Sequence, residues 1–218
     1  MTIEAGLSRG RAHPLEDRQA QAVFASVIET FRVVDHARLN REILNVISQT
    51  RPQDEGISRS NRGGWHSSKT LFTRDEPPMR EICRHIRLAL LTATRRYLPD
   101  FDPSSQPALV EGWINASGKG AYNAPHTHDG CHLSGVYYVS IPDGAAGASS
   151  MLQFFTPLGA TNPLGKLGRA MAPAQHSIRP DEGLLVVFPS YLRHWVPPNE
   201  DEGERVSLAF NFTVPDAR

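Results

Sequence analysis

The chain has 218 residues, of which 39% are hydrophobic and 21% charged, and its formal net charge is zero. This length suits one domain with an N-terminal extension, and the balanced charge gives no general attraction to nucleic acid or to an anionic membrane. The longest apolar runs, such as Leu88–Leu91, are too short to cross a bilayer. No signal-peptide pattern follows Met1, and two cysteines, Cys83 and Cys131, make no disulfide framework. We therefore expect free thiols and a cytoplasmic location.

The first half of the chain is predicted to be a helical support region. Residues 1–16 are polar and aperiodic, which is typical of a flexible tail. Residues 24–31 favour a strand, although their pattern also permits a helix. Asp35 is a candidate N-cap for a helix that ends near Thr50. A second helix, with one apolar stripe, is predicted over residues 77–97.

The second half of the chain is predicted to be β-structure. From residue 108, short strands recur with turn residues between them and leave no room for crossover helices, which favours a sandwich, jelly roll or barrel. The expected strands cover residues 109–116, 121–128, 133–141, 151–156, 173–179, 184–188, 193–197 and 205–213. We expect a single domain over residues 17–218, in which residues 17–107 support a barrel core over residues 108–214.

Two segments are expected to be loops at the mouth of the barrel. Residues 53–64 are polar and contain glycine, and a short strand over residues 65–72 is predicted to follow. Residues 157–173 contain glycine and proline and have weak periodicity. Because long loops are usually functional or mobile, residues 53–66 and 157–173 are predicted to be lids.

Histidines cluster where a predicted strand meets a turn. His126 and His128 are two residues apart, and side chains at that spacing project to the same face of a strand. A distant histidine, His194, could complete one face of an octahedral metal site. The alternative is that these are exposed loop residues, but their grouping beside a glycine turn favours a metal site. His132, just before the next strand, is predicted to contact either substrate or solvent.

A cationic side chain opens the last predicted strand. Arg205 and Ser207 share one face of that strand by period-two alternation. A buried guanidinium needs an anionic partner, and it matches a carboxylate with two parallel hydrogen bonds. Spacing alone leaves two partners open, namely an anionic ligand or a salt bridge to Glu202 or Glu204.

Several motifs, taken in order, resemble one known family. They are Trp113–Asn115, Gly120–His128, Ser134–Val139, Gly183–Ser190, His194–Val196 and Arg205–Ser207. Together they resemble the iron(II)- and 2-oxoglutarate-dependent oxygenases, and most closely a bacterial group distantly related to prolyl hydroxylases. The resemblance covers about residues 109–212. It implies a mainly β fold with N-terminal helices, in which a double-stranded β-helix (a cupin-like jelly-roll barrel) has helices packed on one sheet.

The resemblance also implies roles for single residues. His126 and His194 would be ligands of Fe(II), and Arg205 would pair with the distal carboxylate of the cosubstrate, 2-oxoglutarate. The expected neighbours of that carboxylate are Ser207, Tyr138 and Asn115. The candidates for contact with the substrate are Asn123, His132 and Trp195.

One position departs from the family pattern. Most members have a carboxylate two residues after the first histidine ligand, which gives a site of two histidines and one carboxylate. Here that position is His128, and the carboxylate of Asp129 comes one residue later. Alternation points Asp129 away from His126. The expected ligands are therefore His126, His128 and His194, with Asp129 as the alternative if the strand ends or bulges there.

The expected function is a dioxygenase that converts 2-oxoglutarate to succinate and CO2 and hydroxylates a small-molecule or peptide substrate. Two other functions fit the histidines: a three-histidine, cupin-like dioxygenase that needs no 2-oxoglutarate, and a non-catalytic metal-binding sensor barrel. Arg205 and Ser207 argue against the former, because they would then lack a cosubstrate. We expect no nucleic-acid or membrane partner, and a homodimer is left open.

Overall fold

The computed structural model describes residues 25–142, 148–149, 151–157, 165–171 and 173–215. The predicted tail over residues 1–16 lies outside them. Within the described residues, two antiparallel β-sheets form the centre of the molecule. This arrangement confirms the prediction of a mainly β fold with N-terminal helices. No helix among the described residues has the length and apolarity needed to cross a membrane.

The two sheets are built from strands that are distant in sequence. The larger sheet has the order β1 (Glu29–Arg32), β9 (Leu184–Pro189), β6 (Leu133–Ser140), β11 (Arg205–Thr213), β4 (Leu109–Ser117) and β3 (Trp65–His66). The smaller sheet has the order β2 (Asn61–Arg62), β5 (Tyr122–His126), β10 (His194–Val196), β7 (Leu152–Phe155) and β8 (Gln175–Ile178). The helices are α1 (His36–Thr50), α2 (Pro77–Tyr97) and α3 (Gly165–Met171), and 3-10 turns cover Arg51–Gln53 and Leu71–Thr73.

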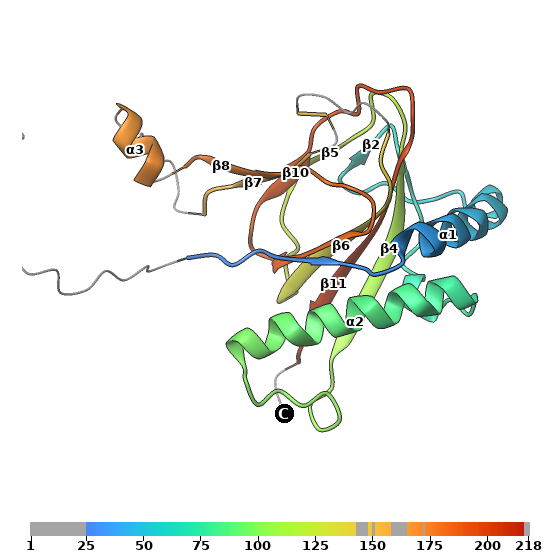
Figure 1. Ribbon diagram of the computed structural model, residues 1–218, viewed down its shortest axis with the longest axis horizontal. Helices are drawn as coiled ribbons and strands as arrows, with labels where there is room; N and C mark the ends of the chain where they lie inside the picture. Colours follow the sequence, from blue (N-terminus) through green and yellow to red (C-terminus); the bar gives the residue numbers. More distant parts are fainter. Residues whose placement is uncertain (1–24, 143–147, 150, 158–164, 172, 216–218) are drawn as a thin grey trace, which may run out of the picture.

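Helices α1 and α2 cover the outer face of the larger sheet, whereas α3 lies away from it beside β7 and β8 (Figure 1). Apolar residues recur every three or four positions on both long helices, so each helix buries one stripe. The buried positions are Leu39, Ile43 and Ile47 on α1 and Met79, Ile82, Ile86, Ala89 and Leu90 on α2. They pack on a continuous row of the sheet, formed by Ile114, Leu208, Tyr137 and Leu185. Burying each such side chain contributes about 1.5–3 kcal/mol, which makes this face the main source of stability.

The predicted helices and strands are confirmed with shifted ends. Residues 24–31 were open to either structure, and the strand β1 forms at Glu29–Arg32 by pairing with β9. Asp35 stands at the N-cap of α1, but the predicted side-chain cap is wrong. Its backbone is left-handed, with φ of 57°, and its carboxylate accepts a hydrogen bond from Arg38 Nε at 2.6 Å instead.

Three local predictions around the loops are wrong. The segment 53–64, expected to be a loop, contains β2, because Asn61 and Arg62 find partners on β5. The strand expected over 65–72 is only two residues long, and a 3-10 turn follows it. The segment expected to be a loop over 157–173 contains α3 in its described part. Cys83 and Cys131 are both free thiols, as predicted.

Candidate metal and cosubstrate site

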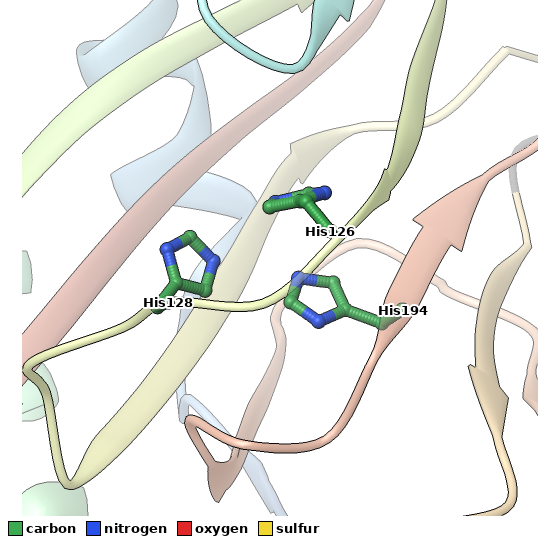
Figure 2. A group of neighbouring side chains, drawn as sticks. All are labelled: His126, His128 and His194. Carbon is green, nitrogen blue, oxygen red and sulfur yellow. The ribbon is translucent and has the colours of Figure 1, made fainter.

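Three histidines, two on neighbouring strands and one on a loop, converge inside the barrel. His126 ends β5, His194 begins β10, and these two residues face each other in the antiparallel register of the smaller sheet. His128 joins them from the loop after β5 (Figure 2). The ring centroids lie 4.4 to 5.2 Å apart. One nitrogen of each ring lies within 4.8 Å of the others, so the three rings form a group that could hold a metal ion.

Backbone carbonyls orient two of the three rings. His126 Nδ1 lies 2.7 Å from the carbonyl of Ala124, and His194 Nδ1 lies 2.8 Å from that of Leu192. A carbonyl only accepts hydrogen bonds, so each Nδ1 carries the proton and donates it. The Nε2 lone pair of each ring is then free for a metal, which is the usual arrangement of ligating histidines.

His128 reaches the group by a different route from the predicted one. The strand expected over 121–128 ends at His126, so period-two alternation does not place the His128 ring. Two backbone hydrogen bonds join its loop to the loop that precedes His194: His128 N–H donates to Ser190 O at 3.1 Å, and Ser190 N–H donates to His132 O at 3.0 Å. These bonds hold the loop on which His128 sits against the segment that precedes His194.

Asp129, the alternative ligand, is exposed and lies outside the group of convergent side chains among the described residues. Its Oδ1 accepts a hydrogen bond from Thr127 Oγ1 at 3.0 Å. Because Thr127 is itself exposed, the carboxylate is engaged on the outside of the loop.

Burial keeps the three imidazoles neutral. It lowers the pKa of His194 to about 3 and that of His128 to about 4, and in both cases the nearby His126 lowers the pKa further. Burial also lowers the pKa of His126. A neutral imidazole has a lone pair for a metal, whereas an imidazolium does not. All three rings are therefore ready to act as ligands at neutral pH.

The inner face of the larger sheet carries polar residues in register. Asn115 on β4, Ser207 on β11 and Tyr138 on β6 are direct cross-strand partners, so their side chains form one row. All three are at least nine-tenths buried and line the same cavity as the histidines. Burial raises the pKa of Tyr138 to about 12, so this hydroxyl is a hydrogen-bond donor.

Arg205 lies one inward position away from Ser207 on β11 and lines the same cavity. It is 2% exposed and faces Ser117 across the strand pair. Its Nη2 makes only long contacts, 3.3 Å to Asn123 Oδ1 and 3.4 Å to Ser117 Oγ, and its buried Nε has no partner. The salt bridge left open by the sequence does not form, because Glu202 pairs with Lys119 and Glu204 pairs with Arg51.

This end of the cavity fits a carboxylate ligand. A buried guanidinium without an acidic neighbour is costly unless an anion reaches it. Asn115 Oδ1, in the adjacent row, is also buried without a partner. The three histidines supply a set of neutral nitrogen donors that suits a divalent iron. The residues of this one cavity therefore fit both a metal ion and an anionic cosubstrate.

The opposite end of the same face carries a second polar network. Trp113 precedes Asn115 by two residues on β4 and lies beside His128, with ring centroids 6.0 Å apart. Glu111, two residues earlier again, accepts hydrogen bonds from Lys69 Nζ at 2.7 Å and Asn211 Nδ2 at 2.9 Å. Ser134 donates to Asn211 Oδ1 at 2.8 Å. Along the inside of the barrel, Arg205 therefore lies at one end, the histidines lie in the middle, and the Glu111 network lies at the other end.

The other predicted substrate contacts are dispersed. Asn123 lines the cavity, but its amide oxygen is engaged by Arg205. His132 lies in a separate apolar groove, where its Nδ1 accepts the Val214 N–H at 3.1 Å. Trp195 donates from Nε1 to Gln153 Oε1 at 2.7 Å and, among the described lining residues, is not part of the histidine cavity.

The sequence analysis missed Trp113, which lines the cavity, and Ser117, which faces Arg205 across the strand pair. Both share the inward face of β4 with Asn115, so alternation along that strand could have found them. His66 is buried and stacks on Trp113 with ring centroids 5.1 Å apart, which only the β3–β4 pairing brings about.

Residues 111–211 match a protein-family model described as "Putative 2OG-Fe(II) oxygenase". This part of the chain is a 2OG-Fe(II) oxygenase domain. The matched residues run from Glu111 to Asn211 and so include the three histidines, Arg205 and the polar row beside it. The protein is thus an Fe(II)- and 2-oxoglutarate-dependent oxygenase, as the motifs predicted. No curated protein matches the chain in sequence.

Solved structures of 2-oxoglutarate oxygenases share the fold. A prolyl-4-hydroxylase from Pseudomonas putida is 18% identical, covers 86% of this chain and 92% of its own, and gives a TM-score of 0.59. HygX from Streptomyces hygroscopicus, solved with nickel, 2-oxoglutarate and hygromycin B, is 14% identical. The match covers 88% of this chain and 84% of HygX, with a TM-score of 0.56. A Trichoplax adhaerens prolyl hydroxylase bound to a peptide of hypoxia inducible factor is 12% identical. The match covers 86% of this chain and 83% of that hydroxylase, with a TM-score of 0.57. These likenesses confirm the double-stranded β-helix.

Proposed function

We propose that the protein hydroxylates its substrate at an iron ion held by His126, His128 and His194. The observation that carries this ligand set is the convergence of the three rings, with the Nδ1 of His126 and of His194 each committed to a backbone carbonyl. Asp129 is the less suitable third ligand because it is exposed and bonded to Thr127. When bound, iron would activate O2, which is the oxidant that converts 2-oxoglutarate to succinate and CO2 and hydroxylates the substrate.

We infer that Arg205 binds the distal carboxylate of 2-oxoglutarate. Its fork can donate two parallel hydrogen bonds to a carboxylate, which the long contacts to Ser117 and Asn123 do not replace. Ser207 and Tyr138 stand in the next row with hydroxyl groups, and the unpaired amide of Asn115 is beside them. These residues would hold the distal carboxylate of the cosubstrate.

We infer that the substrate binds at the other end of the barrel from Arg205. The cosubstrate fills the Arg205 side, so the substrate must approach from the side of Glu111 and Trp113. Successive inward residues of a strand are about 7 Å apart, so Glu111 is one such step beyond the Trp113 ring that lies beside His128. Because Asn211 and Lys69 fix the Glu111 carboxylate, this network offers oriented polar groups to a substrate.

Two experiments separate this function from the alternatives. Anaerobic titration of 2-oxoglutarate into the Fe(II) protein should produce the metal-to-ligand charge-transfer absorption of a chelated keto acid. Oxygen consumption should then require 2-oxoglutarate and produce succinate, even without substrate, at a slow uncoupled rate. Oxygen consumption without 2-oxoglutarate would favour the three-histidine cupin-like dioxygenase, and metal binding without any oxygen consumption would favour a sensor.

We extend this proposal to the class of substrate and to the cellular context of the protein. HygX was solved with hygromycin B and the Trichoplax adhaerens prolyl hydroxylase with a peptide fragment, and these two complexes support a small-molecule or peptide substrate here. The domain division at residues 107 and 108, the lid roles of residues 53–66 and 157–173, a homodimer and a cytoplasmic location remain predictions from the sequence.

A further inference from the structure

The solvent side of α2 carries a stripe of arginines that the oxygenase reaction does not use. Arg80, Arg84 and Arg87 are four and three residues apart, so they share one face of the helix. All three are exposed. The whole of α2 contains five arginines and one acidic residue, Glu81, which pairs with Arg38 of α1 instead.

These arginines line a groove of about 290 Å³ beside the segment that leads into α2. That segment contributes Phe72, Thr73, Arg74 and Asp75 to the lining. The Arg87 guanidinium lies 5.1 Å from the centre of the Phe72 ring, which holds it over the groove. Four arginines therefore line this groove, and Asp75 is the one acidic residue among its described lining.

The positive charge of the groove is not neutralised by its surroundings. Within the described part of the chain, Arg80, Arg84 and Arg87 form no ion pair. Arg74 pairs through Nη2 with Glu76 and Thr50, but its buried Nε has no hydrogen-bond partner. Like charges three and four residues apart destabilise a helix. An anionic ligand would relieve this repulsion and supply the missing acceptor.

We propose that the α2 groove binds the phosphate group of a small ligand, such as a phosphate ester or a polyphosphate. Guanidinium groups match phosphate oxygens with paired hydrogen bonds, and several of them can share one phosphate. The groove lies on the helical side of the larger sheet, whereas the histidine cavity lies on the inner side. Binding is therefore independent of the iron and 2-oxoglutarate site.

The test is calorimetric titration of sodium pyrophosphate into the full chain at low salt, with saturating 2-oxoglutarate present to fill the Arg205 site. One pyrophosphate should bind per chain, and affinity should fall as salt is raised. The double variant Arg84→Gln/Arg87→Gln should bind at least tenfold more weakly. Arg41→Gln, which removes an exposed arginine from α1, should bind as the unmutated protein does.

The variants also distinguish the groove from other sites. Arg205→Ala should still bind pyrophosphate, because its guanidinium is on the other side of the sheet. Parallel titration of inorganic phosphate identifies the ligand class, since a groove for polyphosphates prefers pyrophosphate and a groove for simple esters binds both alike. No binding, binding lost in Arg205→Ala, or full affinity in the double variant would overturn the proposal. If the double variant unfolds, Arg84→Gln alone is used, with the same expected direction.

Discussion

The two faces of the larger sheet show how one set of strands serves stability and chemistry separately. On the outer face, Ile114 and Leu208 are at most 1% exposed, and their row packs under α1 and α2. On the inner face, the adjacent residues of the same strands, Asn115 and Ser207, are polar and also buried. The outer face is saturated with apolar contacts, whereas the inner face retains two buried atoms without partners, on Asn115 and Arg205.

The difference teaches that burial alone does not distinguish a core from a site. Both faces exclude water, but only the inner face leaves polar groups unsatisfied, which costs stability unless a ligand satisfies them. Substitutions on the outer face should therefore change folding and leave ligand affinity intact. Substitutions on the inner face should do the reverse.

The largest effect is expected from the inner ligand set. His194→Ala removes a proposed ligand that is 5% exposed and should weaken iron binding by more than 100-fold, beyond the 10–100-fold typical of residues that only support ligands. Elemental analysis after gel filtration measures the bound iron. His176→Ala, which removes an exposed histidine of β8, is the matched control and should keep full occupancy. Full iron in His194→Ala would show that the ligand set is wrong.

The outer face should respond in stability. Leu208→Ala leaves a cavity under the helices and should lower the free energy of unfolding by about 2–5 kcal/mol. Urea denaturation measures this change. Leu109→Ala, at an exposed position of the neighbouring strand, should change it by less than about 0.5 kcal/mol. The folded fraction of Leu208→Ala should bind iron normally, and a specific loss of iron affinity would break the division between the faces.

Arg205→Ala should separate the two properties most clearly. Truncating one partner of a buried charge pair costs about 2–5 kcal/mol, so 2-oxoglutarate should bind more than tenfold more weakly in the anaerobic titration. Iron should still bind. The free energy of unfolding without cosubstrate should not fall, because the variant removes a buried cation that has no acidic partner. Arg62→Ala, at an exposed site on β2, should bind 2-oxoglutarate normally. Unchanged affinity in Arg205→Ala would remove this residue from the site.

The smallest effect is expected at Asp129, outside the cavity. Asp129→Asn keeps the shape of the side chain and can still bond to Thr127, so iron affinity should fall by less than about tenfold. The comparison is with His128→Ala, measured by the same elemental analysis, which should lose most of its iron. Loss of iron in Asp129→Asn with retention in His128→Ala would reverse the two assignments.

Much of this arrangement could be predicted from local patterns. Alternation along β11 correctly grouped Arg205 with Ser207, and three-to-four spacing gave both long helices. The strand boundaries were less accurate where pairing partners decide them. β2 forms only because its residues pair with β5. β5 ends at His126 because the chain then turns toward Ser190. No pattern within those short segments contains this information.

The sequence by itself determined the types of side chain, the face of the strand or helix on which each one lies, and the family that the motifs indicate. It placed His126, His194 and Arg205 on strands because alternation is a property of the backbone. Only the tertiary structure decided which groups go unsatisfied. Arg205 has no carboxylate partner because Glu202 and Glu204 pair with other residues. His128 joins the other two histidines through a loop that is hydrogen-bonded to Ser190. These outcomes depend on contacts between segments far apart in the chain, whose geometry local periodicity does not specify.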